Sequence, residues 1–385
     1  MQTVDAAGLA IGDGHPPRIM GVLNVSEESP YDPSVYDDPG EAAEYVDEEL
    51  IGEGADVVDV GLESANKRFE VLSAEEELER LDTAVETMES VSGDAVFSIE
   101  TRYAEVAEAA LSRGFDMVND ICGFADPRMP AVCREFDVAV AKMASPPDLE
   151  RPGAIEDVDD IYDALARNGL TDKTIVDPAF GGWSEDKTLA DDRETFHRLR
   201  EFRGYGQPIL VSINRKNFLR DLAGRSTEEA LPVSLAATAM AVERGAHVVR
   251  THDVRETVDA TTISAEFARP RTRHAGPPAV EELDVTTPGE AGRHLDRVGA
   301  DADPRGAVAR TFEVSGLEPA AREELASAAA DGGATVADGD GTALVFGTVD
   351  ALARTARILR DADGDHGESL REAGAAIASA VDRDP

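Results

Sequence analysis

Short apolar runs alternate with amphipathic stretches through the first part of the chain. The runs are almost continuously hydrophobic, which is typical of parallel strands covered on both faces. Between them, apolar residues recur at helical spacing, and Leu78, Leu81, Val85 and Met88, for example, share one helical face. The eight expected strands are RIMGVLNV (18–25), ADVVDVG (55–61), AVFSIE (95–100), MVNDIC (117–122), DVAVAKM (137–143), TIVDPAF (174–180), PILVSIN (208–214) and HVVRTHD (247–253).

Two helix-start signals support this division into strands and helices. Ser73 with Glu76 forms a capping-box pattern ahead of one amphipathic stretch, and Ser226 with Glu229 repeats it before the last strand. Eight strand–helix units in about 250 residues match the number and size of a (β/α)8 TIM barrel. A doubly wound sheet is the alternative, but the even spacing and the missing Gly-rich dinucleotide fingerprint favour the barrel. We therefore expect a TIM barrel over residues 1–268.

The pattern changes after residue 268. The segment ARPRTRHAGPPAV has three prolines and no periodicity, and it predicts a linker over 269–285. A helix, a strand, a second helix, two strands joined at DGDG and a third helix follow. They predict a small C-terminal α/β domain over 286–363 and a tail over 364–385. This domain carries no chemical motif, so packing or oligomerisation is its expected role.

The acidic composition restricts the partners of the protein. The 385 residues include 78 Asp and Glu against 37 Lys and Arg, giving a net charge of −41. Such a field repels nucleic acids and anionic membranes, and its self-repulsion is relieved only when salt screens it. We therefore expect a protein of a salt-accumulating halophile that binds neither nucleic acid nor membrane.

Two further features concern the expected location. No apolar run approaches the roughly 18 residues of a membrane span, and the N-terminus lacks a secretory pattern. Cys122 and Cys133 have neither metal-ligand nor disulfide spacing. We expect a cytoplasmic protein with two structural thiols.

Polar residues gather where the expected strands end. In TIM barrels the carboxyl ends of the strands carry the active site, so these residues should converge on one rim. They are Asn24, Glu63 with Ser64, Glu100, Asn119 with Asp120, Lys142, Asp177, Asn214 to Lys216, and Arg250 with His252.

The mixture of these polar groups indicates the kind of ligand. Carboxylates and amides bind the donors and acceptors of a planar heterocycle, and an ammonium donates to ring oxygen or nitrogen. Arg250 and His252 lie two apart on the last strand, where such barrels commonly bind phosphate. They suit an anion, although an arginine paired to a carboxylate and a histidine that fills space is the structural alternative.

Seven motifs, in order, resemble the dihydropteroate synthase family. They are IMGVLNVSEES, GADVVDVGLES, SIET, VNDICG, DPAFG, NRK and VVRTHDV, and together they extend over residues 18 to 255. The resemblance implies a barrel enzyme that joins a dihydropterin methyl pyrophosphate to p-aminobenzoate and releases pyrophosphate with Mg²⁺ assistance. It also implies a homodimer, and the C-terminal segment resembles a small domain fused to some members.

The resemblance assigns roles to individual residues. Asn24 would hold the metal and the diphosphate, and Arg250 with His252 would bind the leaving pyrophosphate. Glu100, Asn119, Asp177 and Lys216 would form the pterin pocket. The loop for the second substrate would contain Ser64, Ala65, Asn66 and Lys67, together with Asn214.

The chain departs from the family pattern at three places. Glu100 replaces the usual aspartate, Ala65 and Asn66 replace a threonine–arginine pair, and Asn214 replaces a serine. Because the second-substrate loop differs most, the amine is either p-aminobenzoate or a related aniline. Three alternatives remain: a pterin-dependent methyltransferase, a non-catalytic pterin-binding paralogue, and a barrel for a sugar phosphate.

Overall fold

The chain forms two compact units. The computed structural model describes residues 1–25, 34–63, 71–181, 187–274 and 276–382. The first unit is Met1–Arg269 and the second is Pro270–Pro385. Each unit has its own hydrophobic core.

The first unit is built on eight parallel strands in the order β8-β7-β6-β5-β4-β3-β10-β9. A parallel bridge between Val176 and Ile209 joins the two ends of this order, which closes the sheet. The predicted TIM barrel is therefore confirmed. The strands are β3 (Arg18–Asn24), β4 (Val57–Gly61), β5 (Val96–Thr101), β6 (Met117–Asp120), β7 (Ala139–Met143), β8 (Thr174–Asp177), β9 (Leu210–Val211) and β10 (Val248–Thr251).

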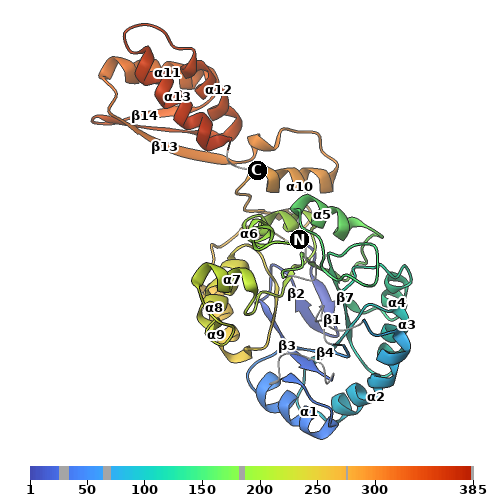
Figure 1. Cartoon of the computed structure of the whole chain (residues 1–385). Coiled ribbons are helices and arrows are strands. Elements are labelled where there is room, and N and C mark those ends of the chain that lie inside the picture. The colour runs from blue at the N-terminus through green and yellow to red at the C-terminus, as the bar shows by residue number, and fades with distance from the viewer. Residues whose placement is uncertain (26–33, 64–70, 182–186, 275, 383–385) are drawn as a thin grey trace. The chain divides into compact units, whose positions relative to one another are not determined.

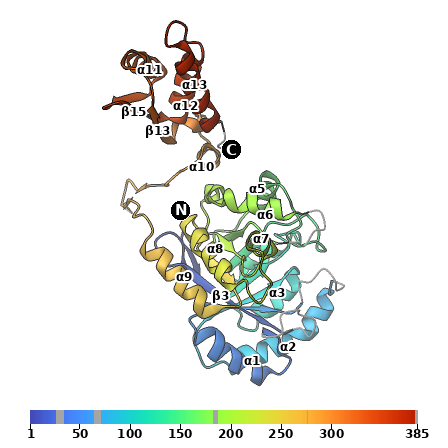
Figure 2. The ribbon, with the colours of Figure 1, turned by 60° about the vertical axis from the view of Figure 1, so that its left-hand side comes forward.

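Helices surround the barrel, as the amphipathic stretches between the strands predict (Figure 1). Figure 2 shows α8 and α9 side by side on one flank. The helices of this unit are α1 (Pro39–Tyr45), continued by a π-helix (Val46–Ile51), α2 (Ala74–Ser90), α3 (Ala104–Leu111), α4 (Met129–Glu135), α5 (Val158–Ala166), α6 (Leu189–His197), a 3-10 helix (Leu199–Tyr205), α7 (Asn217–Ala223), α8 (Leu231–Glu243) and α9 (Val254–Glu266).

The two helix-start signals have different outcomes. Ser73 and Glu76 form the predicted capping box at the start of α2, with reciprocal side-chain to backbone hydrogen bonds. Ser226 and Glu229 also exchange weak bonds, of 3.4 and 3.5 Å, but within a turn. The helix α8 begins only at Leu231, and Pro232 occupies its first turn, where the missing N–H costs nothing.

An N-terminal hairpin closes the base of the barrel. Its strands β1 (Val4–Ala6) and β2 (Leu9–Ile11) pair antiparallel. They pack on inward-facing residues near the start of the barrel strands, in one buried cluster that includes Met20, Val57 and Val248. Removing this apolar surface from water stabilises the closure by about 25 cal/mol per Å².

A buried ion-pair group fastens the chain just after this hairpin. Asp13 accepts bonds of 3.0 and 3.1 Å from the Arg203 guanidinium and lies 3.0 Å from His247 Nε2. Burial opposes the charge of Asp13, but bonds to His247 and Arg203 outweigh it and hold the pKa of that carboxyl well below its usual range. The group therefore ties the segment after the hairpin to the base of the barrel.

The second unit is an antiparallel sheet in the order β13-β15-β14, with helices packed on one face. Its segments are α10 (Pro288–Val298), a 3-10 turn (Pro304–Gly306), β13 (Ala309–Ser315), α11 (Pro319–Gly332), β14 (Thr335–Asp338), β15 (Thr342–Thr348), α12 (Val349–Arg360) and α13 (Gly367–Val381). This order of helices and strands matches the sequence pattern.

Two segments are more ordered than the sequence pattern indicates. The expected tail contains α13, whose Leu370, Ile377 and Val381 are buried in the core of the second unit. A side chain at Gly374 would come within 2.9 Å of the Ala356 carbonyl oxygen, so the absence of a side chain permits close packing on α12. The expected linker contains a short antiparallel pair, β11 (Arg273–His274) with β12 (Val280–Glu281).

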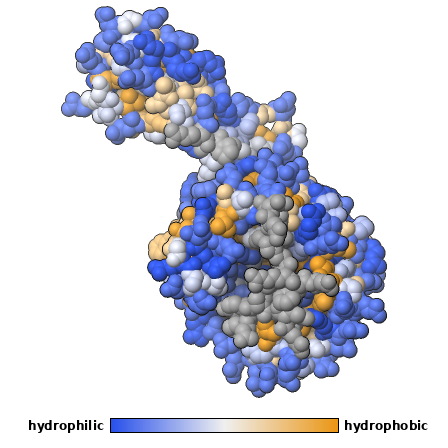
Figure 3. Space-filling view, viewed as in Figure 1, coloured by the Kyte–Doolittle hydropathy of each residue, from blue (hydrophilic) through white to orange (hydrophobic). Residues whose placement is uncertain are grey.

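The described residues on the face seen in Figure 3 are mostly hydrophilic, in agreement with the acidic composition. In the part of the chain that the structure describes, no helix is long and apolar enough to cross a membrane.

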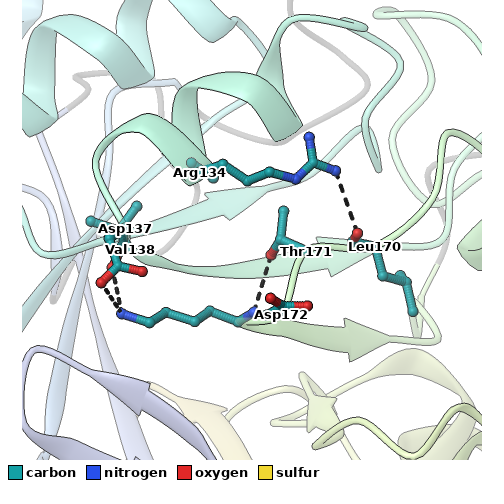
Figure 4. A pocket seen from close by; sticks show the side chains of 8 residues that line it. Arg134, Asp137, Val138, Leu170, Thr171 and Asp172 are labelled. Atoms are coloured by element: carbon teal, nitrogen blue, oxygen red, sulfur yellow. Dashed lines mark hydrogen bonds and ion pairs between the residues drawn. The ribbon is translucent and has the colours of Figure 1, made fainter.

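A small polar cavity of about 270 Å³ lies at the base of β7 and β8, away from the ends that carry Met143 and Asp177 (Figure 4). Lys173 pairs with Asp137 there at 3.0 Å, and Arg134 donates to the Leu170 carbonyl oxygen at 3.5 Å. Since both cations are already engaged, the cavity does not resemble an anion site.

Candidate active site

Polar side chains from opposite walls of the barrel meet inside its mouth. Arg250 lies on β10 and contacts Glu100 on β5, although two other strands separate these in the sheet order. Such a contact is possible only through the interior. The alternation of side chains along a strand explains this contact, because every second residue of a barrel strand faces inward. Val248, two residues before Arg250, belongs to the inner cluster at the barrel base.

Arg250 is held by two carboxylates. Its Nε donates to Asp59 Oδ2 at 2.7 Å, and its Nη2 donates to Glu100 Oε2 at 2.6 Å. Burial alone would lower the pKa of the guanidinium, but the two negative charges raise it above its usual value. Arg250 is therefore a fixed positive charge at the centre of the site.

Asp59 is the residue that the sequence analysis missed. It lies on β4, is 0% exposed, and also accepts a 2.9 Å bond from Asn119 Nδ2 on β6. The sequence prediction takes polar residues only from the last positions of each strand, and Asp59 comes two residues before Gly61, the end of β4. The sequence does contain a signal for Asp59: it is a single carboxylate within an apolar run, and it lies on the same side of the strand as the last residue, Gly61.

Glu100 and Asp177 are carboxyls in a poorly solvated place. Burial raises the pKa of Glu100 above its usual range, Arg250 opposes the rise, and Asp59 adds to it. Burial also raises the pKa of Asp177 to about 6, although a backbone bond from Ala179 and the charge of Lys216 favour the ionised form. Because Ala179 N–H donates to Oδ1 of Asp177 at 2.8 Å, Asp177 retains a second oxygen for a ligand.

Lys216 approaches the Asp177 wall from the N-terminus of α7. Burial and the charge of Arg250 lower the pKa of its ammonium. A side chain at Gly181 would lie 2.9 Å from Lys216 Nζ, and Gly181 has a φ of +104°. The absence of a side chain at Gly181 thus leaves room for the ammonium.

Lys187 anchors the loop that carries Gly181. Its Nζ donates to the Ala179 carbonyl oxygen at 2.6 Å and lies 3.5 Å from Asp192. Asp192 in turn accepts from the Gly181 N–H at 3.1 Å. The contacts among Gly181, Lys187 and Asp192 therefore fix the backbone that follows Asp177.

His252 is a neutral group in this site. Burial and the charge of Arg250 lower the pKa of His252 to about 3. Arg250 therefore carries the positive charge at this strand end, and His252 contributes a neutral imidazole at pH 7.

Asn214 and Arg215 connect the ends of β9 and β10. Asn214 donates to Asp253 at 2.8 Å, and the Arg215 guanidinium makes two further 2.8 Å bonds to the same carboxylate. Arg215 also donates to the Thr227 carbonyl oxygen at 2.7 Å. This fork-to-carboxylate pairing fixes the loops that present Lys216 and His252.

Asn24 presents an amide oxygen to the mouth. Its Nδ2 donates to Ser34 Oγ at 2.9 Å. A side chain at Gly61 would meet Asn24 Oδ1 at 3.2 Å and Glu100 Oε1 at 3.7 Å, so both oxygens border the same space. No group of three or more His, Cys, Asp or Glu side chains suited to a metal occurs in the described ranges. A single amide oxygen fits Mg²⁺, which keeps several waters and bridges to phosphate oxygens.

Three other polar residues at strand ends have structural partners. Lys142 points away from the barrel and donates to the carbonyl oxygens of Leu165, Arg167 and Gly169 after α5. Asp120 accepts from the backbone N–H groups of Cys122 and Phe124. Glu63 pairs with Arg102 and accepts from the Leu72 N–H at 3.0 Å.

Four of the residues expected in the second-substrate loop, Ser64, Ala65, Asn66 and Lys67, lie outside the described residues. Of that group, Asn214 is placed by the structure.

The fold and the site together define a class of protein: a TIM barrel whose mouth brings carboxylates, amides and cations together. A sequence profile of the family described as "Pterin binding enzyme" matches residues 20–252. The chain belongs to this pterin-binding enzyme family.

Several relatives are known dihydropteroate synthases. The chain is 30% identical to the "Dihydropteroate synthase" of Bacillus subtilis over 244 residues, 62% of this chain and 84% of that one. It is 33% identical over 264 residues to a "Probable bifunctional folylpolyglutamate synthase/dihydropteroate synthase" of Halobacterium salinarum. That alignment covers 66% of this chain but only 32% of the relative, so the chain spans about a third of that longer protein.

Solved structures give the same result for the fold. A dihydropteroate synthase of Coxiella burnetii in complex with pteroic acid superposes with a TM-score of 0.58 at 26% identity, covering 69% of this chain and 98% of that one. The enzyme of Thermus thermophilus in complex with 4-aminobenzoate gives 0.56 at 30% identity, covering 69% and 100%.

Proposed function

We propose that this protein is a dihydropteroate synthase. It joins a dihydropterin methyl pyrophosphate to p-aminobenzoate, or a related aniline, and releases pyrophosphate. The observation that carries the proposal is the placement of Arg250 among Asp59, Glu100 and Asn119, which puts an anion-binding group beside ring-binding groups. The kinship with dihydropteroate synthases supports the same activity.

The ring of the pterin is bound by hydrogen bonds of fixed direction. Asp177 is ionised at pH 7, and its remaining oxygen accepts N–H groups from the aminopyrimidine edge. Asn119 donates to Asp59, so its amide oxygen is available as a further acceptor. Lys216, which lies near Asp177, donates to ring oxygen or nitrogen.

The diphosphate is bound at the end of β10. Arg250 and the neutral imidazole of His252 donate to its oxygens and stabilise the charge that develops as the C–O bond breaks. Asn24 would hold Mg²⁺ through its amide oxygen. The metal, when bound, supplies positive charge to the leaving pyrophosphate.

The reaction is a substitution at the methylene carbon. The aniline nitrogen forms the new C–N bond, the C–O bond breaks, pyrophosphate leaves with the electron pair, and the amine loses a proton. No covalent enzyme intermediate is needed. Burial raises the pKa of both Cys122 and Cys133 to about 12, so neither is a nucleophile at neutral pH.

A homodimer is part of the proposal. Helices α7 to α9 expose large apolar side chains: Leu222, Met240, Ile263 and Phe267, of which Phe267 is 81% exposed. Exposed apolar groups concentrated on neighbouring helices are typical of a contact surface. We expect light scattering to give twice the 40.9 kDa chain mass, and Ile263→Glu with Phe267→Glu to give the monomer mass.

The decisive test is turnover. The purified chain is incubated in molar KCl with Mg²⁺, dihydropterin methyl pyrophosphate and p-aminobenzoate, while dihydropteroate and pyrophosphate are measured together. Equal amounts of both products are expected. If the chain binds the pterin diphosphate tightly but forms no product with either p-aminobenzoate or larger anilines, the result would instead indicate a non-catalytic paralogue. Failure to bind it would overturn the assignment.

A further inference from the structure

A single buried oxygen atom links the two halves of the candidate site. Asp59 Oδ2 accepts from Asn119 Nδ2 at 2.9 Å and from Arg250 Nε at 2.7 Å. Asn119 belongs to the proposed ring pocket, and Arg250 belongs to the proposed diphosphate site. The three residues come from β6, β10 and β4, so Asp59 connects walls of the barrel that are not neighbours in sequence.

We propose that Asp59 is a positioning residue that fixes the orientation of the Asn119 amide and of the Arg250 guanidinium for the condensation. This inference rests on the proposed function, since it assigns those two groups to the pterin and the diphosphate.

The effect on Asn119 follows from hydrogen-bond polarity. Asp59 Oδ2 accepts from Arg250 Nε, so the Asn119 amide turns its NH2 group toward this oxygen and its own oxygen the other way. The ligand then meets an acceptor at Asn119 and must offer an N–H there. Asp59 thereby selects the polarity of the ring edge without touching the ring.

The effect on Arg250 is geometric. Bonds from Nε to Asp59 and from Nη2 to Glu100 fix the plane of the guanidinium, since two of its nitrogen atoms are then constrained. The remaining N–H groups of Arg250 therefore point in one fixed direction, in which an anion can bind. Such preorganisation matters because a group already in place need not reorganise as charge develops.

Burial sets Asp59 apart from a surface counter-ion. Its side chain is 0% exposed, whereas Glu100 retains 11% exposure. Its other oxygen, Oδ1, has no hydrogen-bond partner among the residues that the structure describes. All of its recorded bonding is thus directed through Oδ2 at Asn119 and Arg250.

The test is a double-mutant cycle on the full chain. Asp59→Ala removes the acceptor, Asp59→Asn keeps an oxygen of the same shape without the charge, and each is combined with Asn119→Ala. The readout is kcat/KM for the pterin diphosphate, with pyrophosphate affinity by calorimetry as a second measurement. Ser98→Ala is the matched control, because Ser98 is fully buried and lies beside Asp59 in register on β5.

The expected result is a fall in kcat/KM of about tenfold for Asp59→Ala, the size of one lost oriented hydrogen bond. Asp59→Asn should recover part of it, and pyrophosphate should bind more weakly to Asp59→Ala. In the Asn119→Ala variant, the additional Asp59→Ala change should lower log(kcat/KM) by at most half as much as it does in the unmodified chain, because the two residues act through one contact. Ser98→Ala should leave kcat/KM within about twofold.

A merely structural role would give another pattern. Losses that multiply in full with Asn119→Ala, or values for Asp59→Ala within twofold of the unmodified chain, overturn the inference. If Asp59→Ala does not fold, Asp59→Asn carries the same cycle, with a smaller expected loss and with full multiplication of the losses with Asn119→Ala as the result that overturns the inference. If the unmodified chain lacks turnover, the proposed function fails instead, so the two failures are distinguishable.

Discussion

Asp177 gives the site a pH dependence of known sign. Burial raises the pKa of its carboxyl to about 6 in the absence of ligand. Ring N–H donors bind the ionised form, so affinity should be constant above about pH 7 and should fall about tenfold per pH unit well below 6. Calorimetry with a pterin at pH 5 to 8 measures this. Asp177→Asn should bind weakly with no such slope; an unchanged slope in that variant would exclude Asp177 as the titrating group.

Glu100 competes with the diphosphate for Arg250. The longer side chain, where the family pattern has aspartate, reaches the guanidinium at 2.6 Å. Glu100→Gln keeps an oxygen that can accept from Arg250 Nη2, so the guanidinium stays in place, but the charge is removed. Pyrophosphate binding should therefore tighten by about tenfold, the value of one charge-assisted bond. Isothermal titration measures the change. Glu63→Gln is the control, because Glu63 pairs with Arg102 instead; weaker pyrophosphate binding in Glu100→Gln would contradict the competition.

The sequence identified most of the groups now seen in the barrel mouth but not how they bond. Strand ends and family motifs pointed to Glu100, Asn119, Asp177 and Arg250. Lys142 was included because it ends a strand, although Ala141 before it faces inward and parity therefore turns Lys142 outward. The neutral state of His252 was not predictable, because it depends on burial and on the nearness of Arg250.

At the level of elements, the loop after β8 depends on one glycine. Gly181 has a φ of +104°, and an added side chain would lie 2.9 Å from Lys216 Nζ. Gly181→Ala should therefore raise the Kd for a pterin by about tenfold, the equivalent of one lost hydrogen bond. Equilibrium dialysis measures the affinity, and urea unfolding measures stability.

A second glycine separates strain from function. Gly169, before β8, has a φ of +75° and open space around its Cα. Gly169→Ala should cost about 1 kcal/mol of stability, as a positive φ does for alanine, and leave pterin affinity unchanged. Equal losses of affinity in both variants would attribute the Gly181 effect to general destabilisation.

The periodicity predicted the order of elements better than their ends. Seven of the eight barrel strands fall within the predicted apolar runs and β5 extends one residue beyond its run, to Thr101, yet β9 has only Leu210–Val211 as regular strand. The predicted run PILVSIN extends to Asn214, beyond the end of β9. Asn214 and Arg215 bond to Asp253 instead of extending the strand pairing. That partner lies 38 residues further along, beyond the range of a local pattern.

At the scale of the whole molecule, the charge of −41 predicts salt dependence. Raising KCl from 0.1 to 2 M shortens the Debye length from about 10 Å to below 3 Å, which screens most of the repulsion between surface carboxylates. The thermal midpoint should rise by about 10 °C, equivalent to about 8 kcal/mol for a chain of this size at about 2 cal/mol/K per residue. Differential scanning fluorimetry measures it, and a midpoint independent of KCl would contradict the proposed halophilic adaptation.

The division of the chain into two units was visible in the sequence, but the role of α13 was not. Its composition, rich in alanine and glycine, resembles a loose tail, but Leu370, Ile377 and Val381 are buried in the second core and Gly374 permits close packing on α12. Long-range packing of small residues leaves little trace in a one-dimensional pattern.

The sealed base of the barrel has a consequence for the order of events. The β1–β2 hairpin and its apolar cluster close one end, so within the described structure ligands enter and leave through the mouth. Asn119 and Asp59 are buried inside the barrel. Under the proposed function, we therefore expect the pterin to bind before the amine and the joined product to leave through the same opening.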